Sequence, residues 1–147
     1  MHSTTVSEIK IGGLLKIKVK EGRLFRDTET FGKMDPYCML EFRDHKFKTR
    51  VHKDGGKNPR WGDEFEVRVN DLHEEVKFKI MDEDVGSDDT VGYGIIKISA
   101  LCINHGVNDW FSIMYENKLA GQILFETRYV EAVTVQKETV YNPMMQQ

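Results

Sequence analysis

The sequence has 147 residues, of which 39% are hydrophobic and 31% are charged. This length fits one ordinary domain, and the apolar content is enough for one core and too high for a disordered chain. The 21 Lys and Arg residues against 24 Asp and Glu residues give a net charge of −3, which excludes the strong basic field of a nucleic-acid-binding protein.

Hydrophobic residues alternate with polar residues along most of the chain, with the period of two that is typical of half-buried β-strands. The predicted strands, in chain order, cover residues 15–19, 38–42, 47–51, 65–69, 76–80, 96–98 and 123–129. A further strand is available from residues 132–141, or alternatively from residues 6–11. Gly, Pro, Asn and Asp residues separate the strands at short intervals, so we expect an all-β, antiparallel sandwich. Residues 99–109 have room for one short helical turn.

The two ends of the chain are polar or contain proline, and we expect residues 1–8 and 142–147 to be frayed. We divide the chain into an N-terminal extension (1–11), one domain (12–141) and a C-terminal tail (142–147). The sequence has no secretory signal and no apolar run long enough to span a bilayer, so we expect a cytoplasmic protein. Cys38 and Cys102 lie in apolar, strand-like surroundings and are expected to be buried, reduced thiols.

The most concentrated chemical signal is the acidic segment 82–89, which holds five acidic residues among eight. It directly follows a predicted strand and is therefore a loop. Calcium takes six to eight oxygen ligands, and carboxylates on a turning loop supply them, although a solvated acidic turn has the same composition. The segment is not an EF-hand loop, because Ser87 stands where that loop needs glycine and Tyr93 where it needs glutamate.

A second acidic loop contains Glu29 and Asp35. Asp35 directly precedes Pro36, which keeps it out of the helical region of backbone conformation and places it at the start of the next strand. Two acidic loops at one end of a sandwich can face each other, and together they predict a metal site that neither loop predicts alone.

Six segments of the chain, in this order, resemble the C2 domain, a β-sandwich that binds calcium and phospholipid. They are GLLKIKV, GKMDPY, KNPRWGDEF, FKIMDED, SDDTVG and GQILFETRYV, and they lie within residues 12–130. The GKMDPY segment is similar to small single-domain plant C2 proteins. The resemblance implies an eight-stranded antiparallel β-sandwich in the second of the family's two circular permutations, called type II.

The resemblance also implies which residues bind calcium and that two ions bind. The candidate metal ligands are Glu29, Asp35, Asp82, Asp84, Ser87, Asp88 and Asp89. The sequence departs from the family pattern in two ways. Glu29 stands where the family usually has aspartate, and the later loop is one residue short, so Asp88 and Asp89 compete for one role.

The expected partner is an anionic phospholipid membrane, because two calcium ions would change a net charge of −3 to +1. Lys46, Lys48 and Arg50 alternate along one predicted strand and share a face. In the C2 resemblance this strand contributes to a patch that contacts phosphoinositides, whereas a solvated strand face would look the same. Phe31 stands where the family often has a membrane-inserting side chain, and its alternative role is in packing. The corresponding position of the later loop is Gly86, which cannot insert.

The sequence therefore predicts a non-enzymatic, monomeric module that binds calcium and then docks peripherally on anionic membranes, with a protein partner as a further expectation. One alternative is a C2 scaffold that binds proteins without calcium. Another is an enzyme that uses paired carboxylates, but no nucleophile–base motif such as GxSxG is present. The five histidines have no metal-ligand spacing.

Overall fold

The alternating segments of the chain form β-strands in a computed structural model, which describes residues 9–132. Eight antiparallel strands make up the fold. They are β1 (Leu14–Leu24), β2 (Pro36–Phe42), β3 (His45–Lys48), β4 (Arg60–Arg68), β5 (Glu75–Asp82), β6 (Asp89–Lys97), β7 (Asn108–Tyr115) and β8 (Lys118–Val130). The helical elements are α1 (Ile98–Cys102) and the short 3-10 turn η1 (Ile103–His105) in the segment where a short helical turn was expected.

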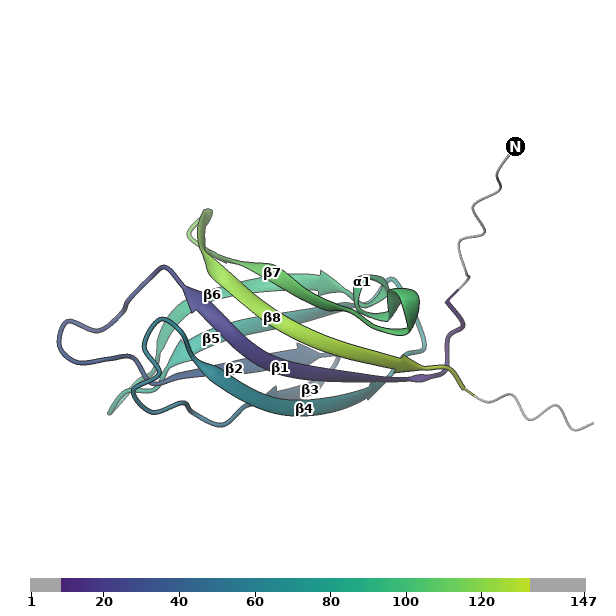
Figure 1. Ribbon diagram of the computed structural model, residues 1–147, viewed down its shortest axis with the longest axis horizontal. Coiled ribbons are helices and arrows are strands. Elements are labelled where there is room, and N and C mark those ends of the chain that lie inside the picture. Colours follow the sequence, from purple (N-terminus) through teal and green to yellow (C-terminus); the bar gives the residue numbers. More distant parts are fainter. Residues whose placement is uncertain (1–8, 133–147) are drawn as a thin grey trace, which may run out of the picture.

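The strands pack as two layers with an apolar core between them (Figure 1). Their order is β3-β2-β5-β6-β7-β8-β1-β4, and β6 and β7 share the single residue pair Tyr93–Met114. The sheet therefore folds over between β6 and β7, and β3 and β4 form its free edges. This arrangement confirms the predicted all-β, eight-stranded sandwich. The last strand, β8, pairs with the first strand through residues 121–130, as expected for the type II permutation.

The eighth strand is β7, which the sequence prediction missed. Residues 133–141 and 6–8 of the two predicted alternatives lie outside the described residues, while residues 9–11 are not in a strand. Ile113 is the one fully buried residue of β7. The strand therefore lacks the alternation of buried and exposed residues by which the other strands were recognised.

Several strand boundaries also differ from the prediction; for example, β4 begins at Arg60 and β6 at Asp89, well before the predicted residues 65 and 96. A β-bulge between Val19 and Glu21 shifts the alternation by one residue, so β1 continues to Leu24 instead of ending at residue 19. The third strand ends at Lys48, so Arg50 does not continue the face of Lys46 and Lys48 as predicted. Ile98 begins α1 and does not extend β6.

The apolar residues that alternate along the strands are the residues that form the core. Phe78 and Phe125 from opposite layers meet edge to face, with ring centroids 5.6 Å apart. Trp61 is buried, and its indole Nε1 donates a hydrogen bond to the Pro36 carbonyl at 2.9 Å. Cys38 and Cys102 are buried free thiols, and burial raises the pKa of both.

Three loops lie together at one end of the sandwich: those between β1 and β2, between β3 and β4, and between β5 and β6 (Figure 1). We call this the loop end. The described chain begins and finishes at the opposite end. In residues 9–132, no helix has the length and apolar character needed to cross a membrane. The predicted domain boundary at residue 141 lies beyond the described residues and stays a prediction.

Candidate metal centre and the surrounding loop surface

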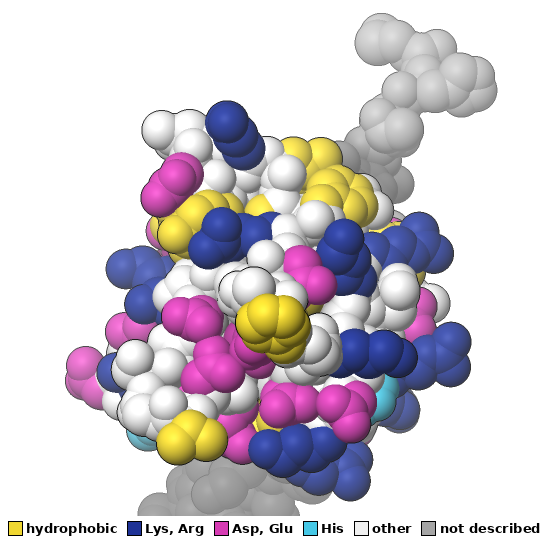
Figure 2. All heavy atoms as spheres, turned by 90° about the vertical axis from the view of Figure 1, so that its left-hand side faces the viewer, with side chains coloured by type: hydrophobic (Ala, Val, Ile, Leu, Met, Phe, Trp, Pro, Cys, Tyr) yellow, Lys and Arg dark blue, Asp and Glu magenta, His cyan; other side chains and the backbone are white. Residues whose placement is uncertain are grey.

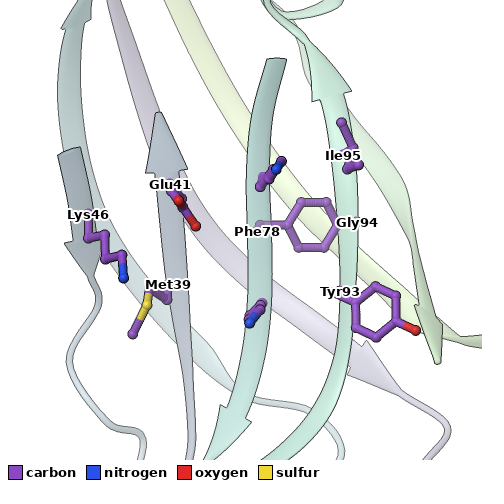
Figure 3. A pocket seen from close by; sticks show the side chains of 9 residues that line it. Met39, Glu41, Lys46, Phe78, Tyr93, Gly94 and Ile95 are labelled. Carbon is purple, nitrogen blue, oxygen red and sulfur yellow. The ribbon is translucent and has the colours of Figure 1, made fainter. Parts of the chain in front are cut away.

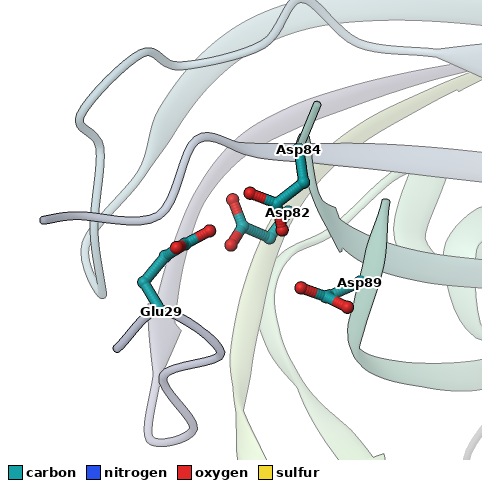
Figure 4. Close-up of side chains that lie close together, drawn as sticks. All are labelled: Glu29, Asp82, Asp84 and Asp89. Atoms are coloured by element: carbon teal, nitrogen blue, oxygen red, sulfur yellow. The ribbon is translucent and has the colours of Figure 1, made fainter. Parts of the chain in front are cut away.

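Four carboxylates meet at the loop end (Figure 4). Glu29, Asp82, Asp84 and Asp89 each offer an oxygen, and these oxygens all lie within 4.8 Å of one another. We call these residues the acidic cluster. Asp82 ends β5 and Asp89 begins β6, and the two residues are paired in the ladder between these strands. Antiparallel pairing therefore brings together two of the acids, and the β1–β2 loop adds Glu29 from a distant part of the chain.

Asp82 is the buried member of the acidic cluster. Its side chain is fully buried, with 0% exposure, and both carboxylate oxygens accept hydrogen bonds. The main-chain N–H of Asp35 donates to Oδ1 at 2.8 Å, and the Thr28 hydroxyl donates to Oδ2 at 2.8 Å. A buried carboxylate needs such partners, and both come from the β1–β2 loop. Asp82 thus holds this loop against the end of β5.

Crowding of the acids changes their protonation. The pKa of Glu29 is raised from 4.5 to about 8. The largest cause is hydrogen bonding with Asp82, and the second largest is hydrogen bonding with Asp84. The neighbouring Asp84 likewise raises the pKa of Asp89. A carboxyl group beside other carboxylates retains its proton because a further negative charge would be repelled. A pKa of about 8 means that Glu29 is mostly protonated at neutral pH in the metal-free protein.

Asp88 and Asp89, which compete for one role in the sequence, have different positions in the structure. Asp89 belongs to the acidic cluster, whereas both oxygens of Asp88 are already engaged. Oδ2 accepts a hydrogen bond from the Tyr37 hydroxyl at 2.5 Å, and Oδ1 accepts one from the Asp84 main-chain N–H at 3.1 Å. These bonds lower the pKa of Asp88, and burial together with Asp88 raises the pKa of Tyr37 to about 12. Ser87 is exposed in the same loop, outside the four clustered acids.

Asp35 lies next to the acidic cluster but is not one of its four members. Its side-chain Oδ1 accepts a hydrogen bond from the main-chain N–H of Asp54 at 2.7 Å, so it holds the β3–β4 loop. Its main-chain carbonyl accepts a hydrogen bond from Glu83 N–H at 3.0 Å. Lys53 of the β3–β4 loop also pairs with Glu83 at 2.7 Å. Asp35 therefore connects all three loops of the loop end.

The donor set of the cluster fits a hard divalent cation. All four side chains offer carboxylate oxygen, the ligand type that calcium and magnesium prefer, and none offers a thiolate or imidazole. Three residues that position the acids without belonging to the cluster were not predicted from the sequence: Thr28, Asp54 and Tyr37. Thr28 precedes Glu29 and Tyr37 follows the Asp35-Pro36 pair, so proximity to the motif was the signal that could have found them.

Two apolar side chains project from the loop end. Phe31 in the β1–β2 loop is 88% exposed, and Val85 in the β5–β6 loop is fully exposed. The space-filling view of this end shows acidic side chains around separate hydrophobic side chains, with Lys and Arg side chains surrounding them (Figure 2). The exposure of Phe31 excludes the alternative role in packing. Val85, beside the expected position Gly86, was missed, although an apolar residue within an acidic loop was a usable signal.

The basic residues predicted to bind lipid do not all lie together. Lys46 and Lys48 lie on β3, and the Nζ atom of Lys48 lies 4.2 Å from the centroid of the Tyr37 ring. Arg50 lies beyond the end of β3, and its Nε pairs with Asp63 of β4 at 3.1 Å. The predicted patch of three residues is therefore divided, because β3 is shorter than the sequence pattern suggested.

Lysines from a second strand join Lys46 on the outer face of the β3-β2-β5-β6 layer. Lys77 and Lys79 project from β5, and with Lys46 they border a pocket of about 250 Å³ (Figure 3). Tyr93 and Ile95 of β6 supply its apolar side. We call this the lysine face. The sequence showed the alternation of Lys77 and Lys79 but not that they lie across β2 from Lys46.

Comparison with known proteins gives one family and many structural neighbours. The family model described as "C2 domain" matches residues 13–113. The chain is 27% identical over 113 residues to 16 kDa phloem protein 2 of Arabidopsis thaliana, covering 76% of this chain and 77% of that protein. It spans between 9% and 16% of the length of three other curated relatives.

Two solved structures illustrate the shared fold. One is a C2 domain-containing protein from a putative elicitor-responsive gene, with a TM-score of 0.73 and 23% identity, covering 92% of this chain and 99% of that chain. The other comprises two C2 domains of Extended-Synaptotagmin 2 with calcium bound. Its TM-score is 0.72 at 22% identity, covering 84% of this chain and 48% of that chain.

Proposed function

This chain belongs to the C2 domain family, and we propose that it is a calcium-dependent module that docks on anionic phospholipid membranes through its loop end. C2 domains are mostly non-enzymatic binding modules, and we propose the same for this chain. The observation that carries the proposal is the convergence of Glu29, Asp82, Asp84 and Asp89 within 4.8 Å. Calcium in a structural neighbour of the same fold supports the choice of ion.

The acidic cluster would hold calcium through carboxylate oxygens. Glu29 and Asp89 would lose the repulsion that raises their pKa values, because a divalent cation would replace the retained proton. Asp35 keeps one carboxylate oxygen, Oδ2, beyond the bond to Asp54 and could serve a second ion, with Ser87 as a further ligand. We propose two ions, as the resemblance implies.

Calcium would reverse the electrostatic field of the loop end. Two ions carry +4 and would change the net charge from −3 to +1, with the whole change concentrated at the cluster. An anionic headgroup, repelled by the free acids, would then be attracted and could complete the coordination of the ions. The protein would thus associate peripherally with the cytoplasmic side of membranes when calcium rises.

Two further groups of side chains support contact with a bilayer. Phe31 and Val85 project from the loop end, where they can enter the interface as calcium cancels the negative charge around them. Lys46, Lys77 and Lys79 of the lysine face offer a second contact to anionic headgroups, at about 1 kcal/mol for each basic residue near the surface. Arg50 forms an ion pair with Asp63 and would therefore contribute less to headgroup binding than these lysines.

Co-sedimentation with phosphatidylserine vesicles, with calcium and with a chelator, tests this proposal. The expected result is sedimentation in calcium alone, and its loss in the variant Asp82→Asn/Asp84→Asn. Asp44→Asn is the matched control, because Asp44 is exposed in the turn between β2 and β3, at the end of β2 away from the cluster. Sedimentation that is equal in calcium and chelator would refute calcium dependence and favour the lysine face. Its absence in both would favour the calcium-independent protein scaffold.

A further inference from the structure

A groove of about 280 Å³ lies between the start of the β1–β2 loop and the hairpin of β7 and β8. Phe25 and Arg26 form one side, and Tyr115, Lys118 and Leu119 form the other. We call it the hairpin groove. Neither the acidic cluster nor the lysine face includes any of these residues.

The walls of the hairpin groove are held by main-chain bonds. The N–H of Phe25 donates to the carbonyl of Ala120 at 2.8 Å, which extends the β1–β8 pairing into the loop. Tyr115 and Lys118 are paired across a two-residue turn, Glu116–Asn117. Both turn residues have positive φ, 48° and 64°, as in the type I′ turn that suits hairpins. The groove is therefore formed before any ligand arrives.

Arg26 is a cation without an acceptor in this groove. Its guanidinium lies 3.8 Å from the centroid of the Tyr115 ring, and its Nε is buried. Within residues 9–132 no atom accepts a hydrogen bond from that Nε, and the ion pairs of this region do not include Arg26. Arg26 therefore brings a positive charge to the groove that no ion pair of these residues neutralises, and this charge favours an anionic ligand.

Apolar and charged groups of the groove are arranged as a phospholipid requires. Phe25 and Leu119 are 56% and 52% exposed, and with the Tyr115 ring they offer an apolar surface. Arg26 and Lys118 supply two positive charges against one negative charge from Glu116. Aromatic, apolar and basic side chains together are typical of surfaces at the headgroup level of a bilayer.

The groove also lies close to the proposed calcium site along the chain. Arg26 of the groove and Glu29 of the acidic cluster belong to the same β1–β2 loop and are three residues apart. A membrane that docks on the loop end would therefore bring its headgroups to the groove as well.

We propose that the hairpin groove binds one anionic phospholipid of the membrane. Its phosphate would lie on Arg26 and Lys118, and its glycerol and upper acyl carbons against Phe25 and Leu119. This inference rests on the proposed function, because docking of the loop end on the bilayer brings the lipid to the groove.

Binding of the full chain to phosphatidylserine vesicles at saturating calcium tests the groove. Arg26→Gln and Leu119→Ser should each weaken vesicle binding about fivefold. The matched controls Arg128→Gln and Val130→Ser change exposed residues of β8 near its other end, and they should leave binding within about twofold of the wild type. Equal vesicle affinity of the groove variants and the controls would overturn the proposal.

Lipid-free calcium titration separates a lipid ligand from an electrostatic neighbour. Arg26→Gln removes a positive charge from the loop that carries Glu29 and should therefore leave calcium affinity unchanged or raise it. Weaker vesicle binding with undiminished calcium affinity supports the groove. A parallel loss of both affinities would overturn it.

Binding of a soluble lipid, without vesicles, tests the groove independently of the proposed function. Short-chain phosphatidylserine, below the concentration at which it forms micelles, is titrated into the protein without vesicles while amide chemical shifts are recorded. Shifts concentrated at Phe25, Tyr115 and Leu119 are expected, and Leu119→Ser should remove them. Shifts confined to other residues, or none at all, would overturn the groove whatever happens at the calcium site.

Discussion

Tyr37 donates its hydroxyl hydrogen to Asp88 Oδ2 at 2.5 Å, and Tyr37 thereby connects the acidic cluster with the basic strand β3. On one side, Asp88 Oδ1 accepts a hydrogen bond from the main chain of Asp84, a member of the acidic cluster. On the other side, the Tyr37 ring lies under the ammonium group of Lys48 on β3. Tyr37 therefore positions the β5–β6 loop relative to the basic strand while touching none of the proposed calcium-binding oxygens.

Removing the Tyr37 hydroxyl should weaken calcium binding. In Tyr37→Phe, Asp88 loses one of its two bonds and Asp84 is held less firmly, as for other residues that support metal ligands. We expect calcium affinity to fall about tenfold in calorimetry. Tyr93→Phe is the control, since it removes a hydroxyl that binds the Glu116 main chain and no acidic side chain. Unchanged affinity in Tyr37→Phe would show that Asp84 needs no support from Asp88.

Neutralising Asp88 and Asp89 separately should have unequal effects. Asp89→Asn removes a carboxylate from the acidic cluster, so calcium binding should fall at least tenfold. Asp88→Asn keeps an oxygen that can accept from Tyr37, and its effect should be several times smaller. Parallel calcium titrations of the two variants measure this difference. A larger loss for Asp88→Asn would reverse the assignment of the two residues.

Calcium should remove the pH dependence that Glu29 gives to the stability of the metal-free protein. The pKa of Glu29 is raised to about 8 in the folded, metal-free protein. The folded state therefore binds more protons than the unfolded state between pH 4.5 and 8, and the contribution of Glu29 to stability is lost as the pH rises through this range. Thermal unfolding should show the Tm of the metal-free protein falling accordingly.

Calcium binding should instead strengthen over the same pH range, because the ion displaces the proton. Below pH 8, affinity for the ion that Glu29 holds should fall about tenfold for each pH unit. Glu29→Gln is the control, since it cannot titrate, and its metal-free Tm should vary less with pH. A calcium affinity that is constant from about pH 6 to 8 would contradict a protonated Glu29.

The exposed apolar residues of the loop end should contribute to membrane binding and not to calcium binding. Replacing both Phe31 and Val85 with serine should reduce vesicle affinity about tenfold or more at saturating calcium, because their apolar surface no longer enters the interface. Lipid-free calcium affinity should stay unchanged. Ile103→Ser alters an exposed apolar residue in η1 and serves as control. Equal vesicle binding by the double variant and the wild type would show that the loop tips do not insert.

The sandwich could be predicted because apolar and polar residues alternate along the sequence in seven of its strands. It was insufficient for β7, where Ile113 is the single fully buried residue, and for β1 beyond Val19, where a bulge changes the alternation. The convergence of Glu29 with Asp82 and Asp84 was expected from two acidic loops at one end.

The choice between Asp88 and Asp89 could not be made from their order in the chain. It depends on the cross-strand pair of Asp82 with Asp89 and on the Tyr37 hydroxyl. In the same way, alternation suggested a common face for Lys46 and Arg50, but the strand ends between them and Asp63 holds the arginine. The role of a side chain could not be predicted from the order of residues along the chain where that role depends on a partner from another strand.

The most direct test of the central claim is a calcium titration of the lipid-free protein by calorimetry, followed by thermal unfolding. We predict measurable heat with two ions bound. We also predict an increase of about 2.7 kcal/mol in unfolding free energy when one site is filled at about 100 times its Kd. Both effects should disappear in Asp82→Asn/Asp84→Asn. No heat and no change in Tm up to millimolar calcium would contradict the proposal that the acidic cluster is a calcium site.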